Sequence, residues 1–331
     1  MNALVSLVTP CYNVEKKIPY FLDSLLSQTY TNVEVIFVDD GSTDKTKDVI
    51  FSYRERIEES GMSFRYIYQE NQGAAGAVAN GLRYVTGKYL IWPDADDVLM
   101  PTSIEKRVDF LEEHPEYGIV RTNAYIVNPQ KPDDKEIMFS KKHMYRRSEI
   151  FRECIRFYTK WCSCSYMVQF ERFLESNPDR YIYPTKAGQN IQMLIPIVYH
   201  SKCAFMDEPL CVYMIYDDSH SHSNGYSSYN KKLKSIYELE EVTLNTIEKL
   251  NLGNRRDRCN VINDFAVRRF CLAYNENKII EKVKFFKELS KFQKINPLFI
   301  LSKYYKNKLL DYGWVFYNKC KYALFVIANR K

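Results

Sequence analysis

The stretch Leu90-Ile91-Trp92-Pro93-Asp94-Ala95-Asp96-Asp97 joins an apolar run to three carboxylates within four positions. Its apolar part predicts a buried strand. Unpaired carboxylates are too costly to bury, so its acidic part needs solvent, basic side chains or a cation nearby. Asp94 and Asp96 offer the oxygen ligands that a divalent cation prefers. The stretch therefore predicts a strand that ends at a polar site.

Apolar segments of two kinds alternate on the N-terminal side of this stretch. Runs of β-branched and aliphatic residues predict strands, and apolar residues at helical spacing predict helices between them. The predicted strands are 4–8, 33–38, 64–68 and 89–92, and the predicted helices are 18–26, 49–57 and 74–85. Because the connections are short, the sequence predicts an α/β fold with a mainly parallel, Rossmann-like sheet flanked by helices.

Two helix starts carry residues that favour capping. Asn13 precedes the first predicted helix and is expected to cap it. Thr102 and Glu105 have the spacing of a capping box on the helix that follows the acidic stretch.

Three of the four predicted strands end in polar segments, at 9–13, 39–42 and 94–97. Because ligands bind beyond the carboxyl ends of parallel strands, we expect these segments to form one site. Asp39 and Asp40 provide acceptors for a nucleobase or ribose, and the alternative is that they cap a helix N-terminus. The segment 9–13 is not a Gly-rich phosphate loop, which argues against nucleotidyl transfer and against dinucleotide binding.

Composition narrows the class of protein. A chain of 331 residues with 46% apolar and 27% charged residues can bury one or two ordinary globular cores. A net charge of +6 is modest, and no nucleic-acid partner is expected. The nine cysteines form no CxxC pair and favour reduced, cytoplasmic thiols. Zinc at Cys162 and Cys164 is disfavoured, because no second Cys or His pair has a familiar spacing.

The C-terminal part differs in character from the rest. Residues 298–331 hold seven basic residues against one acidic residue, interleaved with aromatic residues. This pattern favours peripheral contact with the inner face of an anionic membrane, and the alternative is a helical cap with a solvated basic face. A membrane-spanning helix is not expected, because no run of about 20 apolar residues occurs.

Four motifs in this order closely resemble family 2 glycosyltransferases of the GT-A fold, of the bacterial surface-polysaccharide type. The motifs are residues 8–13, 24–30, 38–44 and 94–97. The resemblance implies metal-dependent, inverting transfer of a sugar from a nucleotide sugar, most often UDP-linked, to a saccharide acceptor that is often lipid-linked. Such transfer serves capsule, O-antigen or exopolysaccharide synthesis. The alternative is a catalytically silent nucleotide-sugar-binding partner in a polysaccharide synthase complex.

The resemblance also implies a division of the chain and a set of site residues. It makes 1–125 the nucleotide-sugar-binding half, 126–228 the acceptor-binding half and 229–331 a helical C-terminal region. The implied donor-binding residues are Thr9, Pro10, Tyr12, Asp39, Asp40, Asn71, Gly73, Asp94 and Ala95. The implied ligands of Mn²⁺ or Mg²⁺ are Asp96 and Asp94, with His220 or His222 completing the metal or diphosphate site.

The expected catalytic base is the main departure from the family. Members usually carry a Glu-Asp pair where this chain has Gln189 and Asn190, and an amide cannot accept a proton at neutral pH. The sequence therefore does not assign the catalytic base to one residue, and carboxylates that follow this pair in the sequence could serve. The catalytic candidates are Asp96, Gln189, Asn190, Asp217 and Asp218, with Asp207 and Glu208 as further carboxylates that could serve.

Overall fold

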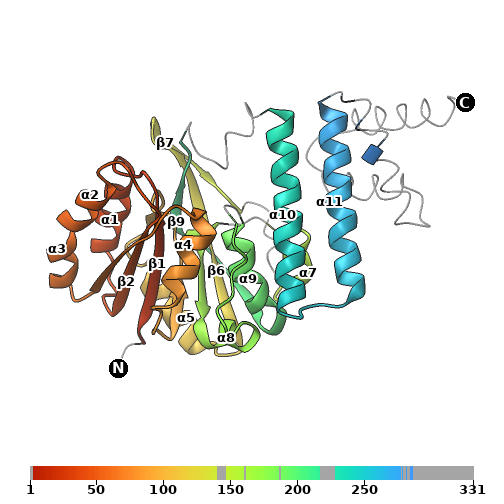
Figure 1. Cartoon of the computed structure of the whole chain (residues 1–331). Helices are drawn as coiled ribbons and strands as arrows, with labels where there is room; N and C mark the ends of the chain where they lie inside the picture. The colour runs from red at the N-terminus through yellow and green to blue at the C-terminus, as the bar shows by residue number, and fades with distance from the viewer. Residues whose placement is uncertain are drawn as a thin grey trace, which may run out of the picture. The chain divides into compact units, whose positions relative to one another are not determined.

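The computed structural model describes residues 3–139, 147–159, 162–185, 188–216 and 228–276, together with residues 278, 281, 284 and 285. The chain forms two compact units, Met1–Tyr226 with Glu241–Arg258 and Ser227–Glu240 with Cys259–Lys331. The first unit contains the sheet and the helices that flank it (Figure 1). The predicted α/β class is confirmed, but the sheet is mixed rather than mainly parallel: its N-terminal strands are parallel, and antiparallel pairings follow beyond them.

Nine strands of the described residues form one sheet in the order β3-β2-β1-β4-β8-β6-β9-β5, with β7 paired to β6. The first four are parallel: β1 (Val5–Cys11), β2 (Val33–Asp39), β3 (Ser63–Tyr68) and β4 (Tyr89–Ile91). The antiparallel strand β8 (Tyr166–Gln169) joins β4 to β6 (Tyr117–Asn128). Next to β6 lie β9 (Lys202–Met214), which is parallel to it, and the antiparallel β7 (Lys131–Ile137). The short strand β5 (Val98–Leu99) pairs with β9.

Side chains of each central strand enter two cores, one on each face of the sheet. In β1, Val5 and Leu7 belong to one core and Val8 to the other, as the alternation of a strand requires. Both faces are covered, which explains why these strands are continuously apolar. The first face is covered by α1 (Ile18–Leu26), α2 (Thr46–Ser52), α3 (Arg54–Glu59) and α5 (Ser103–Glu113). The second is covered by α4 (Gly73–Leu82), α7 (Phe151–Ile155), α8 (Phe170–Ser176) and α9 (Gln189–His200) (Figure 1).

Both capping predictions were wrong. The helix α1 begins at Ile18 without a side-chain cap, and Asn13 has a φ of 51° and accepts a hydrogen bond from the Thr43 amide instead. Thr102 makes no cap hydrogen bond, and Glu105 accepts one from the Thr29 hydroxyl. Asn13 and Glu105 thus form hydrogen bonds with residues distant in the sequence, instead of capping the helix as their local spacing predicts.

Several element bounds also differ from the prediction, and two of these differences have a clear description. The first strand continues through Pro10 to Cys11, because β4 pairs only with Val5, Ser6 and Leu7 and leaves one side of β1 free of a neighbouring strand at Pro10. The predicted helix 49–57 is two helices, α2 and α3, which meet at Tyr53.

Two long helices follow, α10 (Tyr229–Lys249) and α11 (Arg255–Asn275). In the second unit an ion pair joins Lys232 to Glu276 over 2.9 Å, and a second joins Arg269 to Glu240. In the part of the chain that the structure describes, no helix is long and apolar enough to cross a membrane. The basic and aromatic segment 298–331 lies outside the described residues.

Candidate functional site

The polar strand ends converge on one edge of the sheet, as the sequence predicts. The register places Cys11 of β1 level with Asp39 of β2, and Asp39 level with Tyr68 of β3. The amide of Asp40 donates to the Cys11 carbonyl over 2.8 Å, which extends this alignment beyond the strands. The segments after β1, β2 and β3 therefore leave the sheet side by side.

Asp39 and Asp40 are buried and hold the loops at this edge together. Asp39 accepts hydrogen bonds from the Ser42 amide over 2.8 Å and from the Tyr66 hydroxyl over 2.6 Å. Asp40 accepts from the amides of Gln72 and Gly73, over 2.8 and 2.7 Å, at the start of α4. Asp40 thus performs the capping role that was the alternative reading, but for α4 rather than for the helix that follows it in sequence. A carboxylate has about four acceptor positions, so a ligand donor can still bind there.

Two glycines let these loops approach each other closely. Gly41 has a φ of 80°, and a Cβ there would lie 3.0 Å from the Asn71 amide nitrogen. Gly73 has a φ of 81°, a conformation that a side chain strains. The predicted donor-binding residues Asn71 and Gly73 are therefore packed against the loop that carries Asp39 and Asp40.

The segment after β1 presents one buried and one exposed side chain. Thr9 is fully buried, and its hydroxyl has no hydrogen-bond partner among the described residues. Pro10 is half-buried, and the Tyr12 ring is 49% exposed. A buried hydroxyl without a partner is rare and usually signals an unseen water or ligand.

The acidic motif follows β4, where three carboxyl groups lie close together. Asp94 accepts hydrogen bonds from the Ser163 hydroxyl over 2.8 Å and from the Gln189 side-chain amide over 3.5 Å. Burial, and then the negative charge of Asp96, raise the pKa of Asp94 to about 7. Burial also raises the pKa of Asp97 well above its usual range. A divalent cation would remove this repulsion, so the residues present fit a metal held by Asp94 and Asp96.

The amide pair Gln189 and Asn190 begins α9 and lies beside the acidic motif. Asn190 Oδ1 accepts a hydrogen bond from Trp92 Nε1 over 2.9 Å, and Gln189 Nε2 donates to Asp94. The structure therefore brings these two residues to the end of β4, although their partners Asp94 and Trp92 lie 95 and 98 positions away in the sequence. Both amides act here as hydrogen-bond partners of the strand end.

The other carboxylate candidates are engaged elsewhere or lie outside the described residues. Asp207 accepts a hydrogen bond from Asn123 over 2.9 Å, and Glu208 forms an ion pair with Lys106. Residues Asp217, Asp218, His220 and His222 lie in the segment 217–227, which the structure does not describe. Ser163 is the contact that sequence reasoning missed, because a lone serine 69 positions from Asp94 carries no pattern.

Known proteins match this chain in sequence and in fold. The family model for glycosyl transferase family 2 matches residues 6–177. An uncharacterized glycosyltransferase of Rickettsia prowazekii is 35% identical over 130 residues, which is 39% of this chain and 39% of the relative. Glycosyltransferase GlyG of Streptococcus pneumoniae is 33% identical over 114 residues, 34% of this chain and 36% of the relative. The matches thus span about two fifths of these curated relatives.

Two solved structures share the fold at low sequence identity. TarS of S. aureus in complex with UDP-GlcNAc has a TM-score of 0.59 at 16% identity, covering 88% of this chain and 93% of that one. The mannosyltransferase PcManGT from Pyrobaculum calidifontis, in complex with GDP-Man and Mn²⁺, has a TM-score of 0.57 at 16% identity and covers 96% and 83%. With a family match over more than half of its length, the chain belongs to glycosyl transferase family 2 and has the GT-A fold.

Proposed function

We propose that the chain transfers a sugar from a UDP-linked donor to a saccharide acceptor, with inversion at the anomeric carbon and with a divalent cation at the acidic motif. The observation that carries the proposal is the cluster of Asp94, Asp96 and Asp97 at the carboxyl end of β4, beside the ends of β1 and β2. In this proposal residues 1–125 bind the donor and 126–228 bind the acceptor.

The loops after β1, β2 and β3 are proposed to bind the nucleotide. The unpaired Thr9 hydroxyl and the exposed Tyr12 ring offer a polar and an aromatic contact next to the Asp39 and Asp40 carboxylates. TarS binds UDP-GlcNAc and PcManGT binds GDP-Man, which supports a nucleotide-sugar donor on this fold. The choice of UDP comes from the resemblance of the motifs to the family.

Asp96 and Asp94 are proposed to hold Mn²⁺ or Mg²⁺, which when bound would neutralise the charge of the departing diphosphate. Ser163 and Gln189 each donate to one oxygen of Asp94 and so orient this carboxylate. The acceptor oxygen forms its bond to the anomeric carbon as the bond from that carbon to the diphosphate oxygen breaks. The proton of the acceptor hydroxyl must pass to a base, because an alcohol is a poor nucleophile.

Asp217 and Asp218 are our candidates for that base. In the antiparallel pairing of β5 with β9, Val98 lies opposite Val212. The chain of β9 therefore runs past the residues that precede Val98, which are those of the acidic motif. Asp217 and Asp218 follow β9 in the sequence, whereas Asp207 lies earlier in the strand and binds Asn123.

The acceptor is proposed to be a lipid-linked saccharide of a bacterial surface polysaccharide. The segment 298–331 would then make peripheral contact with the inner face of the membrane, since its seven basic residues favour anionic headgroups. Only the composition of the segment supports this part of the proposal.

A second candidate function is favoured by the amide pair. Gln189 and Asn190 replace the expected carboxylates, and both are engaged by the strand end. A protein that binds a nucleotide sugar without transferring it, as a partner in a synthase complex, would need no base.

Release of free nucleotide separates the two functions. We expect UDP release from UDP-sugars with Mn²⁺ and a saccharide acceptor, loss of that release in Asp96→Asn, and a product of inverted anomeric configuration by NMR. Donor binding without release for a broad panel of donors and acceptors would favour the silent partner. Retained configuration would contradict the inverting mechanism.

A further inference from the structure

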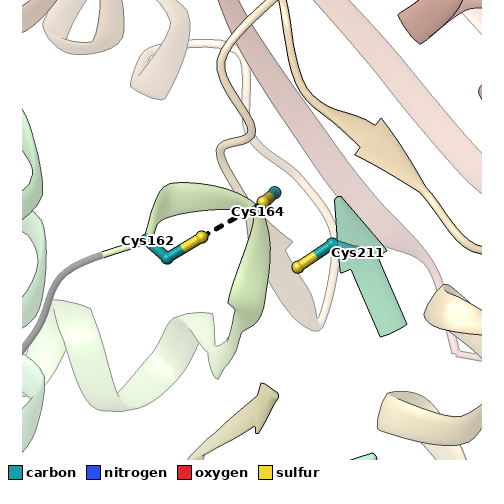
Figure 2. A group of neighbouring side chains, drawn as sticks. All are labelled: Cys162, Cys164 and Cys211. Atoms are coloured by element: carbon teal, nitrogen blue, oxygen red, sulfur yellow. Dashed lines mark hydrogen bonds between the residues drawn. The ribbon is translucent and has the colours of Figure 1, made fainter. Parts of the chain in front are cut away.

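Three cysteines from two distant segments of the chain meet in the core beside the acidic motif. Cys162 precedes the 3-10 turn η1 (Ser163–Ser165), Cys164 lies within it, and Cys211 lies on β9. Their sulfur atoms all lie within 4.8 Å of one another, and the Sγ atoms of Cys162 and Cys164 are 3.3 Å apart. Figure 2 shows the hydrogen bond between Cys162 and Cys164 on the turn as a dashed line, with Cys211 pointing toward them. All three side chains are buried and are free thiols.

We propose that Cys162, Cys164 and Cys211 form a thiolate site for a soft metal ion, with Zn²⁺ as the expected occupant. Three sulfurs held about 2.3 Å from one tetrahedral Zn²⁺ would lie about 3.8 Å apart. The one spacing of 3.3 Å and the upper limit of 4.8 Å for all three pairs are close to this value, so small side-chain movements would bind the ion. Thiolate-rich sites select ions such as zinc, and the fourth position is left to water or to the Asp97 carboxyl, which interacts with the Cys164 thiol.

The surrounding charge fits this occupant. The Arg107 guanidinium is fully buried, and its four hydrogen-bond acceptors are neutral: the carbonyls of Ser103, Cys164 and Tyr166 and the Ser103 hydroxyl. A buried cation needs a counter-charge, and Arg107 interacts electrostatically with the three thiols. Three thiolates carry three negative charges, which one divalent ion and one guanidinium balance.

The site would stabilise a contact of the acidic motif. Ser163 lies between Cys162 and Cys164 in sequence, and its hydroxyl donates to Asp94 over 2.8 Å and lies 3.4 Å from Asp97 Oδ2. An ion that ties the turn to β9 would therefore hold Ser163 in place against Asp94. Its role is structural and separate from the cation proposed at Asp94 and Asp96, and it does not depend on the proposed transfer reaction.

Metal content of the whole chain, purified with a phosphine reductant, tests the proposal. We expect about one zinc per wild-type chain and less in Cys211→Ala and Cys164→Ala, whose zinc affinity should be lower by about tenfold or more, because even loss of a supporting contact costs metal sites about 10-fold to 100-fold in affinity. Cys154→Ala removes another buried thiol outside the cluster and should keep the zinc. Asp96→Asn should also keep it, which separates this site from the acidic motif.

Cobalt gives a second readout, whose decisive part uses the wild type alone. Wild-type protein refolded with Co²⁺ should show a thiolate-to-metal charge-transfer band, which Cys154→Ala keeps and Cys211→Ala loses. Folded wild type without zinc and without this band would overturn the proposal. Equal zinc in Cys211→Ala would also overturn it. An intact mass lower by two hydrogens without reductant would assign the cluster to a disulfide instead.

Discussion

Substitution of Asp40 by Asn should destabilise the protein before any ligand is added. The Asp40 carboxylate accepts from Gln69 Nε2 and the Gln72 amide at one oxygen and from the Gly73 amide at the other, over 2.7 to 2.8 Å. An Asn keeps one oxygen, but its NH₂ group replaces the second oxygen and faces the N–H that donated to it. One hydrogen bond to a charged group is lost and one buried donor is left unpaired, which costs about 2–3 kcal/mol.

Urea unfolding of the ligand-free protein measures this cost. We expect a lower midpoint at an unchanged slope, because the loss is local and the surface exposed on unfolding stays the same. Asp48→Asn is the matched control: Asp48 is exposed in the first turn of α2, and its change should stay within about 0.5 kcal/mol. If Asp40→Asn is as stable as this control, Asp40 does not hold the start of α4, and the reasoning from its contacts fails.

Three further predictions test other parts of the structure. In EDTA, the free energy of unfolding should fall as the pH rises from about 4 to 7, because the raised pKa of Asp94 means that the folded state binds its proton more tightly than the unfolded state does. Asp94→Asn should remove up to about 4 kcal/mol of this fall, at 1.36 kcal/mol per pKa unit. Parallel pH profiles of the two proteins would contradict this. Gly41→Ala should cost about 1–3 kcal/mol by urea unfolding, from its φ of 80° and the Asn71 amide at 3.0 Å; an unchanged midpoint would exclude strain there. Ending the chain at residue 297 should move it from the membrane to the soluble fraction with UDP binding retained, and an unchanged partition would exclude membrane contact by the tail.

The parallel half of the sheet and the convergence of its polar strand ends could be predicted because both follow from local pattern. Alternating strand and helix periodicity favours a parallel order. Asp39 ends β2 and Asp94 lies three positions after the end of β4, and the carboxyl ends of these strands share an edge. The strand before Asp94 could be predicted from its own apolar residues, without knowledge of distant ones.

Contacts between segments far apart could not be read in this way. Ser163 reaches Asp94, and Cys211 reaches Cys162, only because β8 and β9 join the sheet beyond β4 in an order that no local spacing encodes. The same holds for Asn13. Its position favours a helix cap, but its side chain accepts a hydrogen bond from the amide of Thr43 in a neighbouring loop instead. Local propensity is a weak constraint where a tertiary partner is available.

Thermal stabilisation by UDP tests the central claim most directly, because a ligand that binds the native state raises its melting temperature by mass action. Wild type and Asp96→Asn would be heated with UDP, GDP or ADP, each with and without Mn²⁺. We predict a shift with UDP that requires Mn²⁺ and is lost in Asp96→Asn. No shift with any nucleotide, or an equal shift in Asp96→Asn, would contradict a metal-dependent nucleotide site at the acidic motif.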